Sequence, residues 1–179
     1  MTRSRDLANL GDITSTLENQ GLTLISTTTF SAVASQSIND VFSATYENYF
    51  LLTRITDMSV GDNVRIRMRV SGSDDSTSNY SRLGLRITTT VDRTAQYATT
   101  SYPVGETGTK KGAFQTIIYG PFLAALTQFN GLITNGFQSP MENGFNMGAH
   151  NVATSYTGFT LLAESGTMTG NVSVYGYSK

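Results

Sequence analysis

Between Asn63 and Val70 the sequence NVRIRMRV alternates between apolar and charged side chains. Successive side chains of a β-strand point to opposite faces, so a strand here places Val64, Ile66 and Met68 on one face and cations on the other. This period of two predicts a half-buried strand. The remainder of the chain must therefore supply neighbouring strands and an apolar layer against which the buried face can pack.

Short β-branched and aromatic segments, separated by turn residues, recur through the chain. Their spacing of roughly ten residues predicts an all-β antiparallel sandwich rather than a helical or α/β fold. About eight to eleven such strands favour a jelly roll, in which two sheets share one core. The predicted strands span 22–30, 40–45, 49–58, 63–72, 82–90, 95–102, 114–120, 126–133, 144–152, 158–163 and 170–177.

The chain contains no tryptophan, so the aromatic part of the core must come from phenylalanine and tyrosine. Each such side chain contributes on the order of 2 kcal/mol when it is buried. The predicted aromatic core residues are Tyr46, Tyr49, Phe50, Phe114, Phe122, Phe129, Phe137, Phe145 and Phe159.

A chain of 179 residues is long enough for one domain with a sizeable core and a short appendage. We assign residues 22–179 to the sandwich and residues 1–21 to an N-terminal segment for attachment or trimerisation. Ser4 can cap a helix of about two turns there, with Leu7 and Leu10 three positions apart. A helix this short is marginal alone, so the segment either forms it against another surface or remains extended.

Twelve basic and thirteen acidic residues give a net charge of −1, so the whole chain has no long-range attraction for nucleic acid or acidic lipids. The absence of cysteine excludes disulfides and thiolate metal sites. The sequence contains no apolar run long enough to span a membrane or to form the core of a secretory signal peptide. We therefore expect synthesis in a cytoplasm and neither a membrane nor a nucleic-acid partner.

The sequence carries no recognisable catalytic motif. His150 is the single histidine, and the spacing Gly-x-Ser-x-Gly is absent, so we expect His150 on the surface or in a loop. Asp74 and Asp75 lack the register of a calcium loop and are expected in a solvated turn. We predict a non-enzymatic protein with no catalytic residues, no cofactor and no metal.

Arg65, Arg67 and Arg69 are expected about 7 Å apart on the outward face of one strand. Two interpretations are open. The guanidinium groups can remain solvated, which costs little, or the face can contact another protein, because arginine is enriched at protein interfaces. Nucleic acid is disfavoured by the net charge and by the lack of a basic tail.

Three segments carry a resemblance to a known family: INDVFSATYENYFLLTRITDMS (38–59), RMRVSGSDDSTSNYSRLGL (67–85) and the ending GTMTGNVSVYGYSK (166–179). They resemble the jelly-roll modules of fibre and head-decoration proteins of tailed bacteriophages. The resemblance covers residues 36–179. It implies a homotrimer with an N-terminal segment that attaches to the virion and a jelly roll that projects outward.

On this basis we expect a structural protein on the exterior of a phage particle. The short stretch before the sandwich favours a capsid decoration (cement) protein or a short head fibre, bound to the major capsid protein or another virion protein. The residues expected to contact the capsid or a neighbouring subunit are Arg3, Arg5, Asp6, Leu7, Leu10, Arg65, Arg67 and Arg69.

The alternative is a tail-fibre-type receptor-binding module that recognises a glycan on the host cell surface. Its loops at 71–81 and 103–112 would hold the sugar, because carbohydrate sites combine exposed aromatic rings with Asn or Asp side chains. The candidate glycan contacts are Asn79, Tyr80 and Tyr102.

Overall fold

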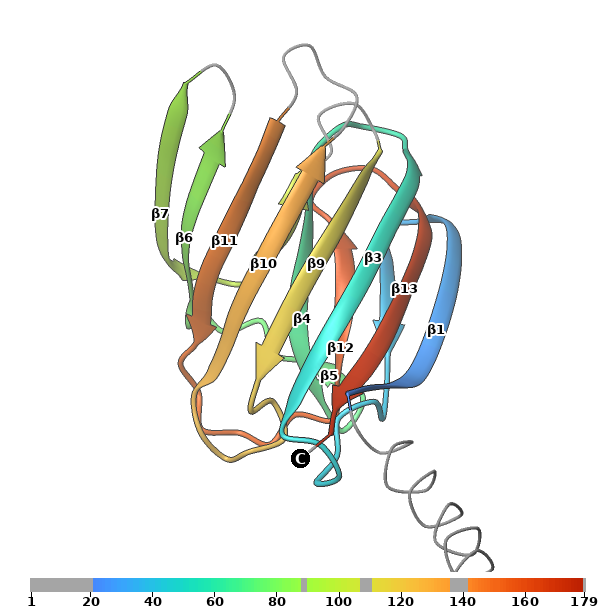
Figure 1. The fold of residues 1–179 in the computed structure, drawn as a ribbon, viewed down its shortest axis with the longest axis vertical. Helices are drawn as coiled ribbons and strands as arrows, with labels where there is room; N and C mark the ends of the chain where they lie inside the picture. The colour runs from blue at the N-terminus through green and yellow to red at the C-terminus, as the bar shows by residue number, and fades with distance from the viewer. Residues whose placement is uncertain (1–20, 88–89, 107–110, 136–141, 179) are drawn as a thin grey trace, which may run out of the picture.

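The structure is a computed structural model that describes residues 21–87, 90–106, 111–135 and 142–178. These residues form strands and no helix, and the strands pair antiparallel in two sheets (Figure 1). The prediction of an all-β antiparallel sandwich is therefore confirmed. The strands are β1 (Leu22–Val33), β2 (Ser35–Ile38), β3 (Asn48–Met58), β4 (Asn63–Val70), β5 (Ser73–Asp74), β6 (Tyr80–Ile87), β7 (Val91–Thr99), β8 (Tyr102–Glu106), β9 (Gly112–Tyr119), β10 (Thr127–Asn135), β11 (Glu142–His150), β12 (Gly158–Ala163) and β13 (Met168–Tyr177).

The two sheets differ in size. The larger has eight strands in the order β1-β13-β3-β9-β10-β11-β6-β7. The smaller has the order β2-β12-β4-β5, and β8 pairs with the other end of β4. In Figure 1 the larger sheet lies in front, with β4 and β12 behind its centre and with β6 and β7 at one edge. The chain passes from one sheet to the other repeatedly, for example from β1 to β2 and from β12 to β13.

β4 alternates as predicted, and its inward side chains form the part of the core that the smaller sheet contributes. Val64, Ile66 and Met68 are fully buried, and in the register of β12 Phe159 pairs with Met68 and Leu161 with Ile66. The larger sheet contributes its own inward row to the same cluster. These residues are Tyr49, Leu51, Ile55, Phe114, Ile118, Phe129, Val172 and Val174.

The predicted aromatic core is confirmed in part. Four of its members are buried, namely Tyr49, Phe114, Phe129 and Phe159, and two pack against the core while partly buried, namely Tyr46 and Phe122. The prediction is wrong for Phe50 and Phe145. Phe50 lies between the inward-facing Tyr49 and Leu51, so it projects from the outer face of β3, and both phenylalanines are only half-buried. Phe137 lies outside the described residues.

Two predicted strands differ from the structure. The segment 40–45 is not a strand but a loop, and it is held by hydrogen bonds from the amides of Val41 and Phe42 to the carbonyl of Thr157. The predicted strand 95–102 is divided between β7 and β8, which belong to different sheets. Ala98, near the end of β7, has a φ of 55°, a value that regular strands do not adopt, and this conformation accompanies the break. The predicted helix near Ser4 lies outside the described residues.

Candidate functional site

The three arginines of β4 project from the outer face of the smaller sheet, as predicted, but their guanidinium groups bind the protein itself. Arg65 donates from Nε to Ser101 Oγ at 2.7 Å and from Nη1 to Glu164 Oε1 at 2.9 Å. Its charge is therefore paired with a carboxylate 99 positions away in the chain.

Arg69 is held still more closely. Its Nη1 binds the Asp74 carboxylate and donates to Thr160 Oγ1 at 2.8 Å, and its Nε donates to Asn39 Oδ1 at 3.0 Å. Arg67 differs, because its Nε donates to a backbone carbonyl, that of Thr100, at 3.0 Å. Within the described part of the chain Arg67 forms no ion pair.

These contacts decide between the two interpretations only in part. The arginines are half-buried and bonded within the chain, so the interpretation that they are simply solvated is wrong. Contact of this face with another protein stays a prediction.

A polar hollow of about 530 Å³ lies beside this row of cations. Its lining includes the guanidinium groups of Arg65 and Arg67, the hydroxyl-bearing residues Thr100 and Ser101, and Glu164. Such a lining can donate hydrogen bonds to a carboxylate or to sugar hydroxyls.

The candidate glycan residues are not brought together at an accessible surface. Tyr80 and Tyr102 are fully buried between the sheets, and only Asn79 is exposed, so the expectation of two exposed rings is wrong. Tyr80 stacks on His150 with ring centroids 3.9 Å apart, and Tyr102 stacks on Phe129 at 4.6 Å. Burial raises the pKa of both phenols, because it disfavours the phenolate. Burying these large rings against other rings stabilises the folded protein more than exposing them to water would.

A buried polar cluster joins three residues that are far apart in the sequence. His150 ends β11 and is fully buried, so the expectation of a surface position is wrong. Its Nε2 lies 3.0 Å from Asp75 Oδ2 and 2.7 Å from the Tyr156 hydroxyl oxygen. The Tyr156 hydroxyl in turn donates to Asp75 Oδ2 at 2.6 Å.

Asp75 is the ionised centre of this cluster, which makes the prediction of a solvated turn wrong for this residue. Its Oδ1 accepts hydrogen bonds from the amide and the hydroxyl of Thr77. Burial alone would favour the neutral acid, but the hydrogen bonds from Thr77, Tyr156 and His150 outweigh it and hold the pKa well below 3.8. The cluster ties the loop after β5 to the segment before β12, which is a structural role.

The alternation of side chains along β11 could have predicted that His150 faces the core. Asn146 and His150 are separated by an even number of positions on β11, so they share the inward face, where both are buried. Its partners could not have been found in this way, because Asp75 lies in a loop and is 75 positions away.

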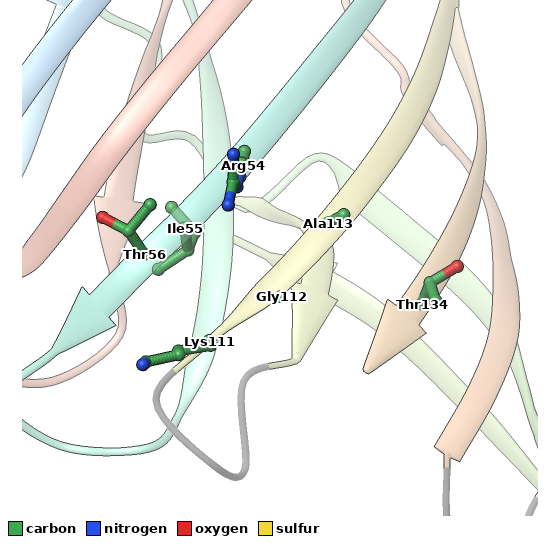
Figure 2. A pocket seen from close by; sticks show the side chains of 7 residues that line it. All are labelled: Arg54, Ile55, Thr56, Lys111, Gly112, Ala113 and Thr134. Carbon is green, nitrogen blue, oxygen red and sulfur yellow. The ribbon is translucent and has the colours of Figure 1, made fainter. Parts of the chain in front are cut away.

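A second hollow, of about 310 Å³, lies near the end of β3 and the start of β9 (Figure 2). Arg54 and Thr56 of β3, Lys111 just before β9 and Thr134 of β10 are among the residues that line it. The two cations could attract an anionic group, although both side chains are exposed and neighbouring solvent weakens that attraction.

Known proteins provide no assignment for this site. No protein-family model matches the chain, and a search of curated proteins finds no match. In the described residues, no group of three or more His, Cys, Asp or Glu side chains is placed to hold a metal ion. The same part of the chain contains no helix long and apolar enough to cross a membrane.

Proposed function

We propose that this chain is a non-enzymatic structural protein of a bacteriophage particle. In this proposal it is a homotrimeric capsid decoration protein or short head fibre on the particle exterior, made in the host bacterial cytoplasm. The observation that carries the proposal is the order of strands in the two sheets.

Eight strands follow the order expected of a jelly roll. In the larger sheet the order is β1-β13-β3-β9, and in the smaller sheet it is β2-β12-β4 followed by β8. Numbered along the chain, these strands read 1-8-3-6 and 2-7-4-5, so the first and last strands pair, as do the second and second-to-last. This nesting supports a jelly roll. The strands β10, β11, β6 and β7 then extend the larger sheet beyond β9, and the short β5 pairs with β4 in the smaller sheet.

The step from fold to function is made by analogy. Jelly rolls form viral capsid domains and also lectin domains, so the fold narrows the function without naming it. The segments at 38–59, 67–85 and 166–179, which resemble phage fibre and head-decoration modules, favour the virion over other settings. A self-associating sandwich of this size also suits closed symmetry around a small number of copies.

The test is the composition of the phage particle. We expect purified particles to contain this chain in many copies, detected by quantitative mass spectrometry, and particles lacking it to bind the purified protein. A variant without residues 1–12 should remain folded and lose that binding. Absence of the chain from particles, when it is abundant in infected cells, would reject the proposal.

A second candidate function is recognition of a host cell-surface glycan. The polar hollow beside Arg67 favours it, since this guanidinium lines the hollow and forms no ion pair with the described residues. The test is binding of purified protein to host polysaccharide, with Arg67→Ser as the variant. Binding to polysaccharide that is lost in this variant, together with no binding to particles, would replace the decoration function with this one.

A further inference from the structure

The outer face of the larger sheet has a largely apolar row of side chains that crosses all eight strands. Cross-strand register aligns one residue from each strand in a continuous row on this face. That row contains Leu24, Tyr175, Phe50, Ile117, Asn130, Met147, Leu83 and Ala95. Asn130 is its single polar member. This is the face turned toward the viewer in Figure 1.

The neighbouring row is mixed, with large apolar side chains at four of its eight positions. It contains Thr27, Ser173, Leu52, Gln115, Leu132, Phe145, Leu85 and Arg93. Several large apolar side chains of the two rows are open to solvent in the single subunit, with exposed fractions of 55% for Leu24, 54% for Leu132 and 49% for Leu83. Exposed apolar patches of this extent are rare on proteins that act as monomers.

The two rows also carry little charge. Across the two rows the one charged residue is Arg93, on the edge strand β7. The polar members elsewhere are amides and hydroxyls, such as Gln115 and Ser173. The outer face of the smaller sheet is different, because its central strand carries three arginines.

The size of the face matches that of a stable interface. Eight strands about 4.8 Å apart, each with four outward side chains about 7 Å apart, cover on the order of 1,000 Å², of which the two rows described above make up roughly half. A flanking row is more polar and includes Asn171, Arg54 and Thr134, so it suits the rim of an interface. A stable protein interface needs about 800 Å² on each partner. The face can therefore supply a whole interface without other parts of the subunit.

We propose that the outer face of the larger sheet is the surface through which copies of this chain associate. This inference deepens the proposed function, on whose homotrimer it rests, by assigning the surface that joins the subunits. Interfaces between identical subunits are more apolar than other protein surfaces and are depleted in charge at their centre, and this face has both properties.

The shape of the face supports a copy of the chain as the occupant. A hollow of about 270 Å³, lined mainly by the apolar side chains of Leu83, Leu85, Phe145 and Met147, lies at one side of it. The exposed Leu24 and Leu52 lie toward the other side, on strands β1 and β3. One face thus contains both a depression and apolar side chains that could fill the depression of a second copy.

The experiment is light scattering coupled to size-exclusion chromatography on the full chain. We expect the wild type at about 10 µM to be an oligomer, and the double variant Leu132→Glu with Met147→Glu to be a monomer, because a charge buried in an apolar interface is costly. Val60→Glu is the matched control, since Val60 is 47% exposed and lies in the turn after β3, away from this face. It should leave the oligomer intact.

Circular dichroism and urea unfolding should show that the double variant remains folded, because both substituted side chains are about half exposed in the subunit. A monomeric wild type would overturn the proposal, including the case in which residues 1–20 of the same chain cover the face. An oligomer that survives both substitutions would overturn it as well. An oligomer that survives both substitutions would overturn this inference and leave the proposed homotrimer intact, whereas a monomeric wild type would remove both. Whether the chain is part of the phage particle is tested separately, by the composition of the particles.

Discussion

The Tyr156 hydroxyl donates a 2.6 Å hydrogen bond to Oδ2 of Asp75, a residue 81 positions earlier in the chain. Tyr156 is fully buried, and its own amide donates to the carbonyl of Pro121. Burial, and then the hydrogen bond to the carboxylate, raise the pKa of this phenol, so it remains a donor at all ordinary pH values. One end of the sandwich is thereby closed by a polar contact between two loops.

Removing this hydroxyl should destabilise the fold. Tyr156→Phe leaves the half-buried Asp75 carboxylate with one donor fewer, and hydrogen bonds to a charged group contribute about 2 kcal/mol. We expect a loss of that size in the free energy of unfolding, measured by urea titration at pH 7.

Tyr102→Phe is the matched control for this substitution and should have the opposite effect. The Tyr102 hydroxyl is buried and has no hydrogen-bond partner among the described residues. Removing it relieves an unsatisfied polar group, so stability should be unchanged or rise by up to about 1 kcal/mol. A loss equal to that of Tyr156→Phe would contradict this account of both sites.

Stability should fall in acid because of Asp75. The folded state holds the pKa of this carboxyl below the value of 3.8, so the unfolded state binds a proton more readily. The stabilisation is complete well above pH 3.8 and is lost progressively as the pH falls below that value. We expect Asp75→Asn to remove this part of the acid dependence, measured by urea midpoints from about pH 2.5 to 7. Parallel curves for wild type and variant would disprove the assignment.

Gly105 should not tolerate a side chain. A Cβ atom added at this position in β8 would overlap the ring of Phe114, which is buried in the core. Overpacking of this kind costs about 1–3 kcal/mol, so Gly105→Ala should lower the free energy of unfolding by that amount. The double variant Gly105→Ala with Phe114→Leu should cost less than the sum of its parts, because the smaller side chain makes room. Strict additivity would locate the strain elsewhere.

The arginines of β4 should differ in their contributions to stability. Arg69→Met leaves the half-buried Asp74 without its cation and should cost about 2 kcal/mol, whereas Arg67→Met removes one bond to a carbonyl and should cost less than about 1 kcal/mol. Urea titration of the two purified variants gives the comparison. Equal losses in the free energy of unfolding for the two variants would show that the ion pair between Arg69 and Asp74 adds no measurable stability.

The strands were predictable where alternation is regular. β3, β4 and β13 begin and end within two residues of their predicted bounds, because in each of them buried and more exposed positions alternate regularly. The loop at 40–45 was mistaken for a strand since Val41 and Phe42 are apolar and buried. Their burial depends on amide bonds to Thr157, more than a hundred positions later, which no local pattern reveals.

For the arginine row of β4, the sequence predicted which side chains share a face but not which groups they bind. Parity placed Arg65, Arg67 and Arg69 on one face, yet their partners Ser101, Glu164 and Asn39 come from other parts of the chain. For the same reason Tyr80 was predicted to be exposed beside a polar loop, whereas its ring turns inward onto His150.

The sequence by itself determined the class of fold and which side chains share a face of each strand, because a period of two is a local property of the backbone. It also determined the low net charge and the absence of thiol chemistry. Only the tertiary structure decided which faces are covered. Sheet order and register depend on contacts between distant strands. Those contacts buried His150, placed hydrogen-bond acceptors from other parts of the chain against the arginines, and left the apolar row on the outer face of the larger sheet open.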